Sequence, residues 1–488
     1  MNKRLLIPCL LLSLHPGIPD TAAAESPGNG IGWWNTYGGR PGWDECSGLA
    51  ECLDGGFLLA GFTDAWTSEM DAFLVRTDQY GNPLWDSRVG GDQADEAWDV
   101  LATVDGGFLV AGCTYSYGLG DGDAWLVRTD SSGSVLWSRT YGTREDDCFY
   151  SIMPVSDGCF IVAGMSGEYP VDVSMYLVKV DQEGNELWHR NYGGGSANSA
   201  DFAMETPDGG FILAGKNMSN SSGSADGWLI KTDSLGGLEW DTILGGPGYD
   251  RFRHVAVSPA GGYIAVGGSG TDSGDDDDLW IVAVDQTGDS LWSRCYGEPY
   301  GSEGAKWISV APSGGFYIAG TSGSHGWPYS DMWLLQVDEV GQFVGEDYYS
   351  GPYCDSGECG IITGDGGVVC AGSAGAYGEF DFLLVEFVPP MGGIPEAGPP
   401  AECGAIVTAH PNPCSGSCVA TVCSPVECIC MIGLYDIAGR LVTTVFEGPV
   451  QAGSSSFPFD TDGLPAGVLY IRICSGYFSA STRFVVLR

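Results

Sequence analysis

The sequence predicts an all-β protein in which a seven-bladed β-propeller, closed by its N-terminal strand, precedes a small immunoglobulin-like β-sandwich. Three observations support the propeller: a unit of about 52 residues recurs seven times, each unit holds four strand-like segments, and one such segment precedes the first unit. Composition agrees, because 77 of the 488 residues are glycine, which suits a chain with many tight turns. Aromatic residues make up 12% of the chain and supply apolar surface for a core.

The repeat begins with a turn that leads into an apolar strand. Residues 54–61, Asp-Gly-Gly-Phe-Leu-Leu-Ala-Gly, return almost unchanged at 105–112. Further copies start at Asp157, Asp208, Ala260, Ser313 and Asp365, so the steps between copies are 51, 52, 51, 52, 53 and 52 residues. This constant period indicates one supersecondary unit per copy.

Further strands accompany each copy of this turn. An apolar strand that ends at an aspartate turn occupies 73–78, 125–130, 176–181, 228–233, 280–285, 333–338 and, in degenerate form, 382–387. An aromatic strand that ends at glycine occupies 85–91, 137–142, 188–194, 240–246, 292–297 and 343–351. A short fourth segment, such as 97–103, precedes the next turn. Four strands in about 50 residues are typical of a propeller blade.

The two ends of the repeat array predict how the ring closes. The unit that starts at Asp365 has no aromatic strand of its own, whereas residues 33–39 form such a strand with no unit before it. Assigning this strand to the last unit completes seven blades within 25–388 and removes the exposed edges of an open array.

These motifs resemble a known class of repeat. The Asp-Gly-Gly strand, the Trp-Leu-Val strand with its aspartate turn, and the strand from Trp to Gly-Gly are similar to those of kelch-type and quinoprotein-type propellers, in particular the propellers of exported bacterial proteins. The resemblance implies the architecture and leaves the activity open, because propellers host many functions.

The N-terminus is typical of a secretory signal peptide, which we assign to residues 1–24. Lys3 and Arg4 precede the apolar run 5–14, and small residues at 22–24 precede Glu25. This run is too short for a bilayer, and no later run reaches the roughly 20 residues required. We therefore expect an exported protein, extracellular or on the cell surface, without a transmembrane segment.

Sixteen cysteines follow the signal, an even number that suits disulfides in an oxidising compartment. Neighbours along the chain are candidate partners, namely Cys46 with Cys52, Cys148 with Cys159, and Cys354 with Cys359. The cysteine spacings do not match those of a zinc site.

The tail follows a Pro- and Gly-rich linker, residues 389–400, and occupies 401–488. Strand-like runs at 432–437, 441–446 and 470–474 alternate with turns and predict a β-sandwich. The tail resembles the type A C-terminal sorting domain of the type IX secretion system through Pro411, Asn412, Pro413, Tyr435, Asp436, Gly439, Arg440, Gly467 and Arg488. The resemblance implies export across the outer membrane and a secretion machinery as partner. A purely structural module, like those related to flagellar hook-capping proteins, is the alternative.

The charge of the propeller excludes two classes of partner. Residues 25–388 carry 14 basic and 55 acidic side chains. This negative field repels the phosphates of nucleic acids and the surface of anionic membranes.

Binding is the function that the loops favour. The connections between the second and third strands are long, variable and aromatic, and they should all lie on one face of the ring. Their aromatic residues are Trp66, Tyr115, Tyr117, Tyr169, Trp327, Tyr329 and Tyr377. Aromatic rings beside carboxylates suit sugar rings, so we expect non-enzymatic binding of a glycan or a protein. No set of catalytic residues stands out; an extracellular carbohydrate-active hydrolase or lyase with a site at the propeller mouth is the alternative.

One acidic loop is a candidate metal site. Asp272, Asp275, Asp276 and Asp277 surround a glycine, and hard oxygen ligands of this kind suit calcium. The spacing differs from an EF-hand, and no other cofactor is expected.

Overall fold

The computed structural model describes most of the propeller and parts of the tail. The described residues are 31–38, 42–65, 70–219, 221, 224–270, 277–297, 301–324, 329–364, 366–376 and 379–388, and then 406–410, 416–424, 428–435, 441–451, 453–461, 464, 467–475 and 479–486. The predicted signal peptide and linker lie outside them. Among the described residues no helix is long and apolar enough to cross a membrane.

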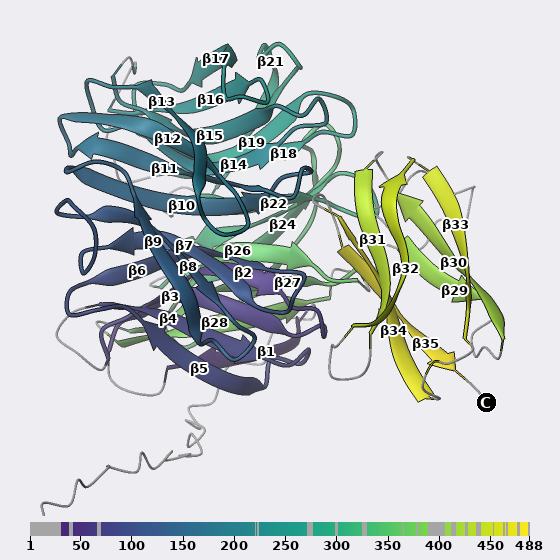
Figure 1. Ribbon diagram of the computed structural model, residues 1–488. Coiled ribbons are helices and arrows are strands. Elements are labelled where there is room, and N and C mark those ends of the chain that lie inside the picture. Colours follow the sequence, from purple (N-terminus) through teal and green to yellow (C-terminus); the bar gives the residue numbers. More distant parts are fainter. Residues whose placement is uncertain are drawn as a thin grey trace, which may run out of the picture.

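The first 28 strands form seven four-stranded antiparallel sheets, the blades (Figure 1). Blade 1 contains β2 (Asp44–Glu51), β3 (Phe57–Thr63), β4 (Asp71–Thr77) and β5 (Pro83–Val89). Blade 2 contains β6 (Asp95–Ala102), β7 (Phe108–Thr114), β8 (Asp123–Thr129) and β9 (Val135–Tyr141). Blade 3 contains β10 (Asp146–Pro154), β11 (Phe160–Glu168), β12 (Asp172–Val180) and β13 (Glu186–Gly193).

The remaining blades repeat the same meander. Blade 4 contains β14 (Ser199–Glu205), β15 (Phe211–Asn217), β16 (Asp226–Thr232) and β17 (Leu238–Leu244). Blade 5 contains β18 (Asp250–Val257), β19 (Tyr263–Ser269), β20 (Asp278–Val284) and β21 (Ser290–Tyr296). Blade 6 contains β22 (Glu303–Val310), β23 (Phe316–Ser322), β24 (Asp331–Val337) and β25 (Phe343–Tyr349). Blade 7 contains β26 (Cys354–Ile362), β27 (Val368–Ala376), β28 (Glu379–Phe387) and the N-terminal strand β1 (Ile31–Tyr37).

The N-terminal strand closes the ring, as predicted. Strand β1 pairs antiparallel with β28, with Trp34 opposite Val385 and Tyr37 opposite Phe382. In Figure 1 the purple β1 lies beside the green β28, so the two ends of the repeat array share one sheet.

Burial explains why the middle strands read as continuous apolar runs. All residues of β3 and β4 are buried, because neighbouring blades cover both faces of these strands. The outer strand β5 alternates between exposed and less exposed residues instead. The inner strand of each blade faces the axis of the ring.

In blades 1 to 4 an ion pair within the blade holds the turn that leads into the second strand. Lys179 Nζ lies 2.6 Å from Asp157 Oδ2, and Lys231 Nζ lies 2.9 Å from Asp208 Oδ2. The equivalent pairs are Arg76 with Asp54 and Arg128 with Asp105. In each repeat the first glycine of this turn has a φ close to that of Gly55, which is +82°. Residues other than glycine rarely adopt this conformation.

Tyrosines at the ends of outer strands bind the next blade. The Tyr37 hydroxyl donates to the Gly81 carbonyl at 2.6 Å, across the seam between blades 7 and 1. The same hydrogen bond joins Tyr141 to Gly184, Tyr192 to Gly236 and Tyr296 to Gly341.

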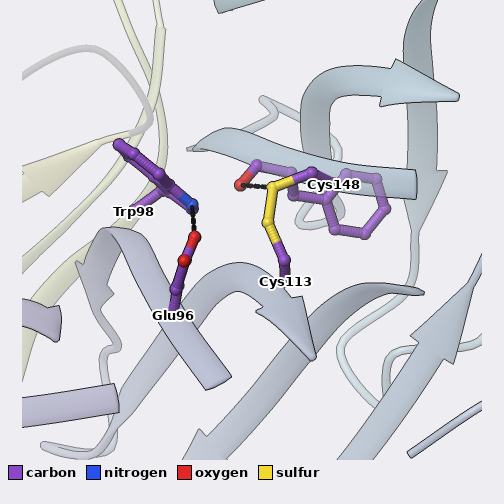
Figure 2. The surroundings of a disulfide bond; sticks show 5 residues. Glu96, Trp98, Cys113 and Cys148 are labelled. Atoms are coloured by element: carbon purple, nitrogen blue, oxygen red, sulfur yellow. Dashed lines mark hydrogen bonds between the residues drawn. A yellow bond between two sulfur atoms is a disulfide. The ribbon is translucent and has the colours of Figure 1, made fainter. Parts of the chain in front are cut away.

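A disulfide also links two blades. Cys113 of β7 bonds to Cys148 of β10, which joins blade 2 to blade 3 (Figure 2). The predicted pairing of Cys148 with Cys159 is therefore wrong, because the partner comes from a neighbouring blade and not from the neighbouring strand.

The other two predicted pairs are also wrong. Cys354 and Cys359 lie in one extended strand, β26, and Cys46 and Cys52 lie along β2 and just beyond it. Five residues of strand span about 16 Å, far beyond the roughly 7 Å that a disulfide allows between Cα atoms.

The tail forms two sheets. One contains β29 (Ile406–His410), β30 (Ser417–Ser424) and β33 (Gly453–Asp460), and the other contains β32 (Leu441–Val450), β31 (Cys428–Tyr435), β34 (Gly467–Ser475) and β35 (Ser479–Val486). Buried residues of both sheets, such as Val422 and Ile432, share one apolar core. Of the predicted sorting residues, Tyr435 ends β31 and Gly467 begins β34. Pro411, Asn412, Pro413, Asp436, Gly439, Arg440 and Arg488 lie outside the described residues.

Candidate functional site: the central channel

A ring of seven side chains lines the channel at one level. Each inner strand carries a β-bulge at the same position of the repeat, where its pairing with the second strand shifts by one residue. A bulge leaves one residue unpaired and redirects its side chain. All seven bulge residues line the channel: Ser47, Trp98, Tyr150, Asp201, Arg253, Lys306 and Glu358.

This ring, which we call the bulge ring, differs in chemistry from blade to blade. The backbone feature is constant, whereas its residue is a serine, a tryptophan, a tyrosine, an acid or a base. The cavity that contains the bulge ring measures about 2830 Å³ and extends to turn residues such as Gln182, so it has room for a ligand larger than a single sugar.

Blades 4 to 6 make one side of the channel cationic. Arg253 and Lys306 of the bulge ring are joined by Arg251, two residues before Arg253, and by Lys216 of β15. These four, the cationic arc, are four of the only 14 basic residues in 25–388.

Each cation in this arc already has a polar partner. Arg251 pairs with Asp201, and Arg253 Nη1 lies 3.6 Å from Asp201 Oδ2. Lys306 Nζ lies 2.6 Å from Glu358 Oε2. The Lys216 ammonium donates to the Tyr249 hydroxyl at 3.1 Å. Among the three cations with a carboxylate partner, Arg253 has the most distant one and shares it with Arg251.

The ionisation of these groups reflects burial. Burial opposes the charge of Asp201, but Arg251 and Arg253 outweigh it and hold the pKa of this carboxyl below its usual value. Burial lowers the pKa of Lys306 despite the attraction of Glu358. Burial and the nearby Arg251 likewise lower the pKa of Arg253. A further negative charge in the channel would stabilise both cations.

Two acids of blades 1 and 2 also lie at the channel. Burial and the charge of Glu358 raise the pKa of Glu45, although Lys306 and Arg253 act on it in the opposite direction. Burial raises the pKa of Asp99 to about 7. Both Asp99 oxygens accept backbone N–H groups, one from Val100 at 2.8 Å and one from Ile152 of blade 3 at 2.9 Å. Asp99 therefore joins two blades and does not offer a free carboxylate to the channel.

Next to the cationic arc, blades 2 and 3 place aromatic rings in the bulge ring. Trp98 and Tyr150 meet edge to face, with ring centroids 5.5 Å apart at 88°. The Trp98 indole N–H donates to Glu96 Oε2 at 3.2 Å, close to the inter-blade disulfide (Figure 2). This hydrogen bond fixes the plane of the indole.

The predicted loop aromatics are only partly described. Trp66, Trp327 and Tyr377 lie outside the described residues. Tyr115 and Tyr169 line the channel. Tyr117 packs 6.4 Å from Trp125 and donates to the Gly90 carbonyl at 2.9 Å, a structural role. Tyr329 contacts Tyr353, with ring centroids 5.9 Å apart. Of the four described loop tyrosines, two therefore line the channel and the other two make different contacts.

The predicted calcium loop is mostly undescribed as well. Asp272, Asp275 and Asp276 lie outside the described residues, whereas the Asp277 carbonyl accepts the N–H of Glu303 at 2.6 Å. Within the described part of the chain, no group of three or more His, Cys, Asp or Glu side chains could hold a metal ion.

His254 is the histidine nearest to the bulge ring. Its ring stacks on Phe202 with centroids 3.6 Å apart, and burial lowers its pKa to about 3. It is therefore neutral near pH 7 and serves packing between blades 4 and 5.

Sequence reasoning missed the bulge ring and the cationic arc. The signal was present: one position in the fourth segment of the repeat changes between Ser, Trp, Tyr, Asp, Arg, Lys and Glu, whereas the position directly before it is always Cys, Ala, Phe or Gly. Variation at one fixed position of a regular repeat is typical of a ligand-facing surface.

Comparisons with known proteins find distant similarities. No protein-family model matches the chain. The regulatory protein FlaEY of Caulobacter vibrioides is 28% identical over 160 residues, which cover 30% of this chain and 16% of FlaEY. The chain therefore matches only about a sixth of the length of this curated relative.

Solved structures with a similar backbone are distant in sequence. The β-propeller domain of the Trilobed protease from Pyrococcus furiosus is 10% identical, covers 70% of this chain and 93% of its own, and has a TM-score of 0.41. Puromycin hydrolase is 13% identical, with 78% and 58% covered and a TM-score of 0.46. Sqt1 from Chaetomium thermophilum is 12% identical, with 72% and 83% covered and a TM-score of 0.43. At these values the likenesses do not indicate an activity.

Proposed function

We propose that this chain is an exported, non-enzymatic binding protein whose channel holds an acidic glycan. The observation that carries the proposal is the cationic arc, which gathers four of the 14 propeller cations in a channel of a strongly acidic protein. Acids outnumber bases in the rest of the channel lining as well as over the whole propeller, so the cationic arc is the part of the channel that would stabilise a carboxylate ligand.

The aromatic rings of blades 2 and 3 favour a sugar as the carrier of that charge. Trp98 and Tyr150 offer apolar faces on which a sugar ring stacks, while Arg253 and Lys306 suit the carboxylate of a uronic acid. Tyr115 and Tyr169 extend the aromatic lining of the channel.

Export follows from two sequence features that support each other. The signal peptide delivers the chain across the inner membrane, and the tail that resembles a type A sorting domain engages the type IX secretion machinery. Deleting 401–488 should leave the protein in the periplasm, and unchanged secretion of the deletion variant would refute this part.

A glycan array with the mature full chain tests the ligand. Uronate-containing glycans should bind, and their carboxyl-reduced forms should not. Arg253→Gln should weaken binding by roughly 10- to 100-fold, the range for a lost charged hydrogen bond. Arg294→Gln, on the outer strand β21, is the matched control and should bind as the parent does.

Two results would overturn the proposal. Equal binding of neutral and acidic glycans would remove the role of the cationic arc. Turnover of a polysaccharide by the purified chain would favour the hydrolase or lyase alternative.

A further inference from the structure

Two free cysteines meet at the seam where the ring closes. Cys46 belongs to β2, the inner strand of blade 1, and Cys359 belongs to β26, the inner strand of blade 7. The two strands contact each other across the seam, although their residues come from opposite ends of the repeat array. The mechanism of ligand binding proposed above uses neither thiol.

The repeat explains why the side chain of Cys359 faces blade 1. Cys359 directly follows the bulge residue of its strand. In blade 2 the residue at this position is Asp99, which accepts the N–H of Ile152 in blade 3 at 2.9 Å. In blade 3 it is Ser151, whose hydroxyl accepts the N–H of Ala203 in blade 4 at 3.3 Å. The position after the bulge therefore contacts the inner strand of the next blade.

Blades 4 and 6 follow the same rule. Phe202 of blade 4 stacks on His254 of blade 5, with ring centroids 3.6 Å apart. Trp307 of blade 6 packs against blade 7 at Gly360, where a Cβ would stand 2.9 Å from the indole ring. Because the ring is closed, the blade that follows blade 7 is blade 1.

On the other side of the seam, Cys46 faces blade 7. Its N–H donates to Ser373 Oγ of β27 at 3.1 Å, and its thiol donates to the Gly48 carbonyl at 3.7 Å. Gly48 holds in blade 1 the position that Cys359 holds in blade 7. The Cys46 thiol thus points to the part of β2 that the side chain of Cys359 approaches.

The two sulfur atoms are neighbours. Cys46 belongs to the apolar cluster at the seam, and Cys359 packs against that cluster. A hydrogen bond between the two thiols, together with burial, raises the pKa of Cys359 above its usual value. Cys46 is fully buried, whereas Cys359 is only half-buried and lines the channel. A reagent in the channel therefore reaches Cys359 first.

We propose that Cys46 and Cys359 form a disulfide that covalently closes the propeller between blade 7 and blade 1. Blades 2 and 3 are joined in the same way by Cys113 and Cys148. The bond would link two residues that are 313 positions apart, at the seam that β1 and β28 also close. A cross-link over so long a loop removes conformational entropy from the unfolded chain.

The oxidant in this step is a second disulfide, such as oxidised glutathione. Cys359 loses its proton and attacks the oxidant, and one thiolate of the oxidant leaves. Cys46 then loses its proton and attacks the Cys359 sulfur of the mixed disulfide, which forms the new S–S bond and releases the second thiolate. The two cysteines lose two electrons and two protons, and the oxidant becomes two thiols.

The test is peptide mapping of the full mature chain by mass spectrometry without reduction. The folded chain is incubated with oxidised glutathione, and its remaining thiols are alkylated during unfolding. A pair of peptides that holds Cys46 and Cys359 should appear as one species and separate on reduction. Because the pKa of Cys359 is raised, this species should form faster as the pH increases.

Three variants make the test specific. Cys46→Ala should stop the reaction at the mixed disulfide, so that Cys359 carries glutathione. Cys359→Ala should leave Cys46 as a thiol that is alkylated on unfolding. Cys370→Ala is the matched control, because Cys370 is a buried free cysteine of β27 in the same blade. The cross-link should form in this control as it does in the parent.

The Cys113–Cys148 disulfide in the same map guards against loss of folding, since it forms only where blades 2 and 3 pack. The proposal is overturned if the parent contains this disulfide but no bond between Cys46 and Cys359. It is also overturned if either cysteine is bonded to a different one, or if Cys370→Ala removes the cross-link.

Discussion

The tyrosine hydrogen bond at the seam gives a quantitative test of ring closure. In Tyr37→Phe the ring stays packed, since Tyr37 is 7% exposed, and only the hydroxyl is lost. The 2.6 Å bond to Gly81 disappears and leaves a buried carbonyl without its donor. A net hydrogen bond contributes about 0.5–1.5 kcal/mol and an orphaned buried group costs about 1–3 kcal/mol, so we expect a loss of about 1.5 kcal/mol. This is roughly a tenfold rise in the unfolding equilibrium constant.

Urea unfolding of the full chain, followed by tryptophan fluorescence, measures this loss. Tyr349→Phe is the matched control, because Tyr349 ends the outer strand β25 at the same repeat position and no hydrogen bond of its hydroxyl is found among the described residues. It should change stability by less than about 0.5 kcal/mol. The reasoning fails if Tyr37→Phe is as stable as the parent, or if both variants lose the same amount.

Three further predictions concern the channel and its walls. His254 has a pKa of about 3 when folded and 6.5 when free, so the unfolded chain binds a proton that the folded chain does not between these values. Stability should therefore fall as the pH is lowered from 6.5 towards 3, and His254→Phe should flatten this part of the unfolding profile relative to the parent. Asp201→Asn leaves Arg251 and Arg253 without their counter-charge and should cost about 3–5 kcal/mol in urea unfolding, whereas a cost below about 1 kcal/mol would mean that the pair is not buried as described. Reduction of the Cys113–Cys148 disulfide, which closes a loop of 35 residues, should cost about 3–4 kcal/mol, while Cys295→Ser should leave the effect of reductant unchanged.

The fold could be predicted from the sequence because the same turn and strand motifs occur in seven repeats. Asp54 and Gly55 specify a turn, and the apolar run after them specifies a strand that is covered on both faces. Because the motif occurs seven times, degenerate copies could still be recognised from their position in the repeat. The strand at 33–39 belongs to no repeat unit that precedes it. Pairing it with the last unit, through β28, was the arrangement that leaves no free sheet edge.

The candidate site was harder to predict from the sequence, for a physical reason. Arg253 and Lys306 lie 53 residues apart and meet only because each occupies a bulge on a strand that faces the axis. A bulge depends on the register of the finished sheet and has no signature in the residue itself. The predicted pairing of Cys148 was wrong for the same reason, since Cys113 and Cys148 become neighbours only when blades 2 and 3 pack against each other.

The seam between β1 and β28 also determines the order in which the protein can fold. Trp34 must pair with Val385, so the contact that closes the ring joins residues 351 positions apart and has the highest loop-closure entropy in the propeller. Each of the first six blades is a local meander that forms from about 50 contiguous residues, whereas the seventh needs both ends of the array. Closure is therefore the slow, late step of folding, and until it occurs the edge of β28 is open to pairing with another chain. A chain that is synthesised from its N-terminus cannot avoid this condition, because its first strand must wait for the last.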